Sequence, residues 1–179
     1  MALKSTIHRA ELTVSDLDRH HYETYSLTLA RHPSETSERM MVRVLAFALY
    51  ADERLEFGKG LSTDDEPALW QKSLSGEIER WIEVGLPDER VLRRACGRAR
   101  EVVLVAYGGR AAGIWWEANR AACEKLSNLR VIDVPQETSS TLGSMAEKNM
   151  SLTATIQDAH LLLASDAATV AVECAVLKE

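Results

Sequence analysis

The chain has 179 residues, a length typical of one globular domain, and we expect residues 1–179 to form a single domain. Hydrophobic residues make up 46% and charged residues 27%, which excludes an intrinsically disordered chain. The net charge of −6 argues against a protein that coats nucleic acid through its overall field. Because the sequence has no apolar run of membrane-spanning length and no signal-peptide pattern, we expect a cytoplasmic protein without a membrane partner.

Two alternating segments near the amino terminus predict a β-hairpin. Apolar residues occupy every second position over 10–14 and over 25–29, and a polar stretch between them supplies the turn. His32 and Pro33 end the second strand. Ser34 is a suitable N-cap for a helix over 34–51, in which apolar residues recur at helical spacing.

The middle of the chain predicts three short strands within 55–61, 68–72 and 77–84, then a helix that begins at Asp88. The uninterrupted apolar run over 102–107 is typical of a strand that is covered on both faces. A Gly-Gly turn leads from it into a helix around 114–126, and residues 129–134 form another buried strand.

The last part of the chain predicts a carboxy-terminal β-meander. Residues 136–149 are polar and indicate a connecting loop with one short helix. Alternation returns at Leu152, with turns at 158–159 and 166–167 and a last strand over 170–176. The fold class is therefore α/β, with an α+β mixed sheet. Over about 34–134, the order helix, three strands, helix, strand is the αβββαβ arrangement of a restriction-endonuclease-like core.

Carboxylates from two neighbouring strands define a candidate metal site. Glu83 lies in an apolar strand, where a buried charge needs a cation or hydrogen-bond donors. A turn at 73–76 places Glu66 opposite Glu83, or Asp65 after a slip of one residue. Converging carboxylates bind Mg²⁺ or Mn²⁺, which keep water ligands free for phosphate chemistry. Alternatively, Asp65 and Glu66 lie in a solvated turn and Glu83 pairs with an arginine.

Two further groups flank this site. Glu38 lies at the end of the apolar stripe of the first helix, where it either completes the acidic site or interacts with the helix dipole. Arg90, Arg94 and Arg98 recur every four residues along the next helix. They either contact a phosphate backbone or form salt bridges at a solvated border.

Several segments resemble the YaeQ family of bacterial proteins, namely HPSETSERM at the start of the first helix, YADERL at its end, DDEP, WIEVGLPDE and RRAC. The resemblance covers essentially the whole chain and implies the fold of the PD-(D/E)XK nuclease superfamily. It matches Glu38 to an acid of the first core helix. Asp65 or Glu66 matches the acid of the second core strand, and Glu83 matches the acid of the third.

One position departs from the superfamily pattern, because Gly85 stands where a lysine would orient the attacking water and stabilise charge on the phosphate. Lys59, on the preceding strand, and Arg90 or Arg94, on the following helix, are the candidates to supply that cation.

The resemblance leaves two functions open. The first is a Mg²⁺- or Mn²⁺-dependent phosphodiesterase or nuclease that acts on nucleic acid, with Asp65 or Glu66 and Glu83 as metal ligands and Glu38 positioning water or a second metal. The second is a nuclease-like scaffold that serves as a non-catalytic binding or regulatory module. Gly85 and the acidic net charge favour the second function.

Overall fold

The computed structural model describes residues 4–59 and 65–179, which form two compact units. The first unit holds the chain up to Ala51 together with Glu137–Glu173, and the second holds Asp52–Gln136 together with Cys174–Glu179. The fold is mixed α+β, with two mixed sheets and four helices in the described residues. None of these helices is both long and apolar enough to cross a membrane. That residues 1–179 form one domain stays a prediction.

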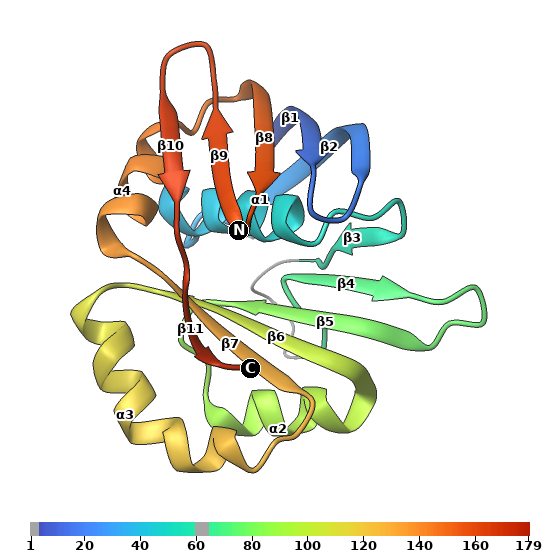
Figure 1. Cartoon of the computed structure of the whole chain (residues 1–179), viewed down its shortest axis with the longest axis vertical. Coiled ribbons are helices and arrows are strands. Elements are labelled where there is room, and N and C mark those ends of the chain that lie inside the picture. Colours follow the sequence, from blue (N-terminus) through green and yellow to red (C-terminus); the bar gives the residue numbers. More distant parts are fainter. Residues whose placement is uncertain (1–3, 60–64) are drawn as a thin grey trace. The chain divides into compact units, whose positions relative to one another are not determined.

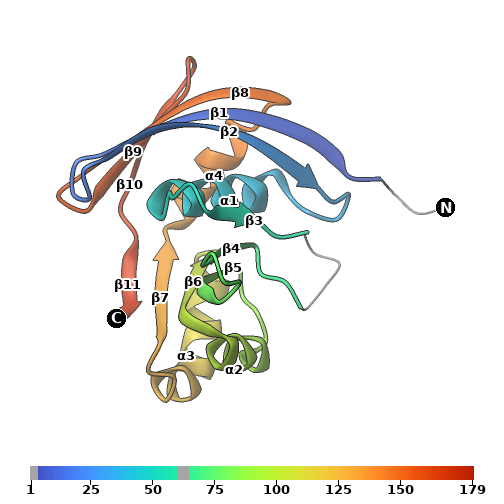
Figure 2. The same ribbon diagram turned by 90° about the vertical axis from the view of Figure 1, so that its right-hand side faces the viewer.

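The first unit is built on a five-stranded sheet in the order β10–β9–β8–β1–β2. The predicted amino-terminal hairpin and the first part of the predicted meander are both present, and β1 joins them because it pairs antiparallel with β2 and parallel with β8. One face of the sheet is buried, and Figure 2 shows α1 and α4 on the same side of it. The elements of this unit are β1 (Thr6–Asp16), β2 (His21–Arg31), α1 (Ser37–Leu49), α4 (Gln136–Ser144), β8 (Asn149–Gln157), β9 (His160–Ala164) and β10 (Thr169–Val172).

The first helix begins later than predicted. Its N-cap is Thr36, whose hydroxyl oxygen accepts a hydrogen bond from the backbone N–H of Arg39 at 3.0 Å. Ser34 cannot serve as the cap because it belongs to the preceding turn, where its backbone N–H donates to Nδ1 of His32. The apolar residues of α1 are buried on almost every side, so packing stabilises this helix more than propensity does.

The second unit is built on a six-stranded sheet in the order β11–β7–β6–β5–β4–β3. Strands β3 to β5 are antiparallel, whereas β5, β6 and β7 are parallel and are connected through α2 and α3. Figure 1 shows both helices on one side of these strands. This placement is expected because both parallel connections are right-handed and lead in the same direction across the sheet. The elements are β3 (Leu55–Phe57), β4 (Leu69–Lys72), β5 (Ile78–Val84), α2 (Glu89–Arg98), β6 (Ala99–Tyr107), α3 (Arg110–Glu124), β7 (Leu129–Val134) and β11 (Ala175–Lys178).

The predicted buried strand is confirmed, because residues 102–106 of β6 are each at most 1% exposed. The helix that begins at Asp88 is also confirmed, with the Asp88 side chain accepting from the backbone N–H of Arg90. Of the predicted strand 55–61, only Leu55–Phe57 form β3, and residues 60 and 61 lie outside the described residues.

The prediction of one last strand over 170–176 is wrong. β10 ends at Val172 in the first sheet, and β11 begins at Ala175 in the second, where it pairs antiparallel with β7. Apolar residues keep the same alternation across both strands, so periodicity alone could not locate the change of sheet.

Candidate functional site

The predicted register of the β4–β5 hairpin is wrong. Leu69 pairs with Ile82 and Trp70 with Trp81, which shifts the hairpin by two residues from the register that would place Glu66 opposite Glu83. The backbone N–H of Ser73 donates to the carbonyl of Glu77, so the turn encloses three residues and ends in a left-handed glycine. This turn shifts the register by one residue, and a bulge between Gln71 and Lys72 shifts it by a second residue.

Glu66 contacts the segment that follows β3. Its Oε2 accepts from the backbone N–H of Lys59 at 3.0 Å, and Nζ of Lys59 lies 3.9 Å from Oε1. The Lys59 side chain is 81% exposed, so this ion pair contributes little to stability. The contacts of Glu66, one of the predicted metal ligands, are thus with Lys59 rather than with Glu83.

Four residues form what we call the Glu83 cluster: Asp65, Trp81, Glu83 and Arg98. Trp81 and Glu83 share a face of β5 because they are two residues apart, and Nε1 of Trp81 donates to Oε1 of Glu83 at 2.8 Å. The Arg98 guanidinium lies 5.0 Å from the centroid of the Trp81 ring. Its Nη1 also donates to the backbone carbonyl of Asp65 at 3.0 Å. The structure thus connects Asp65 to Glu83 through Arg98 and Trp81.

The cluster lies on the helix-covered face of the second sheet. Trp81 is 2% exposed and packs in one core with Leu92 and Ala95 of α2. Glu83, two residues along the strand, is half-buried at the same face. Burial of the tryptophan therefore fixes the side of the sheet on which Glu83 lies.

The arginines of α2 have different surroundings. Arg90 forms an ion pair with Asp88, and hydrogen bonds from the Arg90 side chain and backbone lower the pKa of the Asp88 carboxyl. The salt-bridge interpretation thus applies to Arg90. Arg94 is exposed and makes no ion pair or hydrogen bond to the residues that the structure describes. Because Arg94 and Arg98 are one helical turn apart, they lie on the same side of α2.

Glu38 belongs to the first unit, where it contacts α4. The hydroxyl of Ser139, which is fully buried, donates to Oε1 of Glu38 at 2.7 Å. This contact gives Glu38 a role in holding α4 against α1. Its predicted proximity to Glu83, which belongs to the other unit, stays a prediction.

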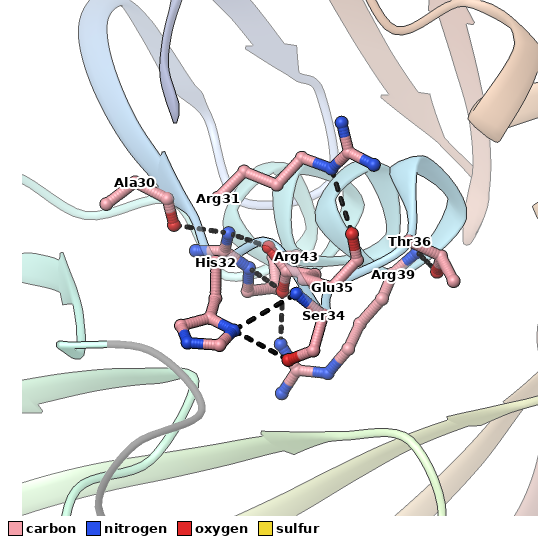
Figure 3. A network of polar contacts seen from close by, with 8 residues as sticks. All are labelled: Ala30, Arg31, His32, Ser34, Glu35, Thr36, Arg39 and Arg43. Atoms are coloured by element: carbon pink, nitrogen blue, oxygen red, sulfur yellow. Dashed lines mark hydrogen bonds and ion pairs between the residues drawn. The ribbon is translucent and has the colours of Figure 1, made fainter. Parts of the chain in front are cut away.

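Sequence reasoning left one polar network of the first unit undescribed (Figure 3). The carboxylate of Glu35 pairs with Arg39 and Arg43, and Nη2 of Arg43 also donates to the carbonyl of Ala30 at 3.2 Å. Arg31 donates to the carbonyl of Glu35 at 2.9 Å. The network connects the end of β2 to α1. The spacing of four residues between Glu35, Arg39 and Arg43 was a usable signal for it.

Within residues 4–59 and 65–179, no group of three or more His, Cys, Asp or Glu side chains is arranged to hold a metal ion. Of the predicted ligands, the structure links Asp65 and Glu83 within one cluster and pairs Glu66 with Lys59 instead. The Mg²⁺ or Mn²⁺ site stays a prediction.

Fold and site together define a mixed α+β protein with two mixed sheets, in which the arginine-bearing helix α2 packs on the buried Trp81 that hydrogen-bonds Glu83. The chain belongs to the YaeQ family, since the sequence model described as YaeQ protein matches residues 1–174.

Its relatives are bacterial. The Uncharacterized protein YaeQ of Escherichia coli (strain K12) is 50% identical over 166 residues, which cover 93% of this chain and 92% of the relative. The protein of the same name from Salmonella typhi is 50% identical over 167 residues, with the same coverage.

Two solved structures of the family are closely similar to this one. The crystal structure of YaeQ protein from Xanthomonas axonopodis pv. citri has a TM-score of 0.94 at 46% identity and covers 97% of this chain and 98% of its own. The structure from Pseudomonas syringae has a TM-score of 0.94 at 38% identity and covers 98% and 97%. The fold described above is thus that of the family.

Proposed function

We propose that this protein is a nuclease-like scaffold that binds phosphodiester chains through α2 with little or no turnover. The order α1, β3, β4, β5, α2, β6 supports the scaffold, because it follows the αβββαβ arrangement of the PD-(D/E)XK superfamily over about 34–134. Fold-level analogy by itself does not assign an activity, so the residues of the site carry the proposal.

The observation that carries the proposal is the pair formed by Arg94 and Arg98 on one side of α2, of which Arg98 belongs to the Glu83 cluster. Arg94 has no partner among the described residues, and Arg98 lies one turn further on the same side of α2. The position of the Arg98 guanidinium over the Trp81 ring and its hydrogen bond to the Asp65 carbonyl restrict its orientation. A guanidinium that is already ordered loses less entropy when its planar fork binds a phosphate.

Two observations favour binding over hydrolysis. Gly85 replaces the lysine of the superfamily pattern, and Glu83 accepts a hydrogen bond from the Trp81 indole. Loss of one preorganised donor that stabilises transition-state charge lowers the rate by about 10²–10³. Turnover on ordinary DNA is therefore expected to be weak or absent.

Metal-dependent hydrolysis is the second candidate function, and it rests on the match of Glu38, Asp65 or Glu66, and Glu83 to the acids of the superfamily pattern. Asp65, Glu66 and Glu83 would hold Mg²⁺ or Mn²⁺, and Glu38 would position water. Lys59 and Arg94 would supply the missing positive charge.

The binding proposal is tested by fluorescence anisotropy with labelled single-stranded and duplex DNA and RNA over a range of salt concentrations. Arg94→Ala should weaken binding to every sequence alike and reduce the salt slope by about one, as expected for one lost phosphate contact. Arg120→Ala is the matched control, because Arg120 is an exposed arginine of α3 paired with Glu124. Equal affinity of Arg94→Ala and the parent would contradict the proposal.

The two functions are separated by calorimetric titration of Mn²⁺ and by cleavage assays in Mn²⁺, each with the parent and with Glu83→Ala. Mn²⁺ binding and robust cleavage by the parent, both abolished in Glu83→Ala, would establish the second function. Equal cleavage by both proteins would indicate a contaminating nuclease.

A further inference from the structure

We propose that an apolar pocket of the second unit binds an organic monocation, with Asp133 as its counter-ion. The pocket has a volume of about 730 Å³ and lies against α3, β7 and β11. This volume is in the range of small-molecule sites. The proposal is independent of the phosphodiester-binding function, since it involves neither α2 nor the Glu83 cluster.

The walls of the pocket are mostly apolar. They are formed by Ala112, Ile114 and Trp116 of α3 and by Leu177 of β11. Ile114 is 61% exposed, although a helix that covers a sheet normally directs its large apolar side chains inward. These walls suit a ligand with an aliphatic or aromatic body.

Asp133 gives the pocket a specific polar group. It lies within β7 and lines the pocket, and its neighbours in register are Ala106 of β6 and Ala175 of β11. These small neighbours offer no side-chain donor. Oδ1 of Asp133 is buried and accepts no hydrogen bond from the residues that the structure describes.

The hydrogen bonding of Asp133 differs from that of Asp16, another aspartate with a buried carboxylate oxygen. Asp16 is 2% exposed, but its carboxylate accepts hydrogen bonds from the backbone and the guanidinium of Arg19. Oδ1 of Asp133 has no such partner in residues 4–59 and 65–179, and burial raises the pKa of its carboxyl group. A carboxylate that is poorly solvated and unpaired gains more from a ligand cation than an exposed carboxylate does.

Two other charged residues, Glu117 and Arg110, line the pocket and limit the charge that a ligand can carry. Glu117 adds a negative charge, which favours a cation over an anion. Arg110 also lines the pocket, and it makes no ion pair with the described residues. Its positive charge disfavours a second cationic group on the ligand. A monoammonium compound with an apolar body therefore fits better than a polyamine.

The test uses three probes of the same chain length: hexylammonium, hexanol and hexanoate. Their binding is measured by two-dimensional NMR titration of the parent, Asp133→Asn and Glu117→Gln. In the parent, hexylammonium should bind about tenfold more tightly than hexanol and shift the amide resonances of α3 and β11. Asp133→Asn should abolish this preference while hexanol still binds, and Glu117→Gln should change it by less than about threefold.

Equal binding of hexylammonium and hexanol to the parent would overturn the proposal, and this comparison does not depend on the folding of any variant. An unchanged preference in Asp133→Asn, or tighter binding of hexanoate, would also overturn it. A second copy of the chain is an alternative occupant of the pocket. If sedimentation shows a dimer that Ile114→Asp converts to a monomer, the pocket is an interface and the proposal is wrong.

Discussion

Glu35 and Arg43 form a buried, doubly hydrogen-bonded ion pair in the first unit, with both side chains 2% exposed (Figure 3). Nη2 of Arg43 lies 2.6 Å from Oε1 of Glu35, and Nε lies 3.0 Å from Oε2. Replacing one partner leaves the other charge buried and unpaired, so Glu35→Leu should lower the free energy of unfolding by about 3–5 kcal/mol. Urea denaturation of the parent and variant measures this difference.

The matched control is the exposed pair of Arg120 and Glu124, whose disruption by Glu124→Leu should cost less than about 1 kcal/mol. The double variant Glu35→Leu, Arg43→Met should be less destabilised than Glu35→Leu alone, because it removes both charges. If the double variant is instead destabilised by the sum of the two single effects, the pair is not the source of the loss.

Periodicity and capping residues predicted β6 and α2 of the second unit well, because the signals for both are local. The run over 102–107 favoured a covered strand, and Asp88 before an amphipathic segment marks a helix start. Between Val172 and Ala175 the chain passes from the first sheet to the second. This change depends on which strand edge is available for pairing, and no local sequence pattern encodes which edge that is.

The candidate site could be predicted only in part. The apolar surroundings of Glu83 correctly indicated a need for a cation or hydrogen-bond donors, and the Trp81 indole two residues away is one such donor. The position of Glu66 depended on the hairpin register, which a three-residue turn and a bulge both altered. The contact of Arg98 with Asp65 connects residues 33 apart in the sequence, and helical spacing shows only the side of α2 on which Arg98 lies.

Two glycines of the second unit should respond in opposite directions to substitution by alanine. Gly76 has φ +89° in the β4–β5 turn, so Gly76→Ala should lower the free energy of unfolding by about 1 kcal/mol through backbone strain. Gly97 lies within α2, and an added Cβ would meet nothing within 4 Å, so Gly97→Ala should raise it by about 0.5–1 kcal/mol. Thermal and urea unfolding report both effects. A change of the same sign in both variants would contradict the assigned conformations.

Asp18 should make the stability of the first unit depend on acid pH. Backbone N–H groups of Ala159 and Asp158 each donate to its carboxylate at 2.8 Å, and these bonds lower the pKa of Asp18. A folded-state pKa below the unfolded value of about 3.9 stabilises the protein above that pH, and the stabilisation is lost as the pH falls through the folded pKa. The difference in Tm between the parent and Asp18→Asn should therefore be largest at pH 5–7 and shrink below about pH 4. Glu53→Gln, which removes an exposed carboxylate, is the control. If the difference in Tm between the parent and Asp18→Asn does not vary with pH, the charge of Asp18 does not stabilise the first unit.

The thiols of Cys96 and Cys174 should be almost unreactive at neutral pH. Burial raises the pKa of each to about 11, and the negative charge of Asp133 contributes to the rise at Cys174. At pH 7 about one thiol in ten thousand is then ionised, and the thiolate is the reactive form. The rate of modification by a disulfide reagent should rise about tenfold per pH unit up to about pH 10. Because the unfolded-state pKa is about 8.5, these half-buried thiols stabilise the protein below that pH, and this stabilisation is lost as the pH rises through the folded pKa.

The modification rates are measured by absorbance. Mass spectrometry identifies the modified residue and so distinguishes Cys96 from Cys174. Asp133→Asn removes the negative charge that raises the pKa of Cys174, so Cys174 should react faster in this variant while Cys96 is unchanged. A rate that levels off near pH 8–9 in the parent would mean that these thiols ionise as exposed cysteines do.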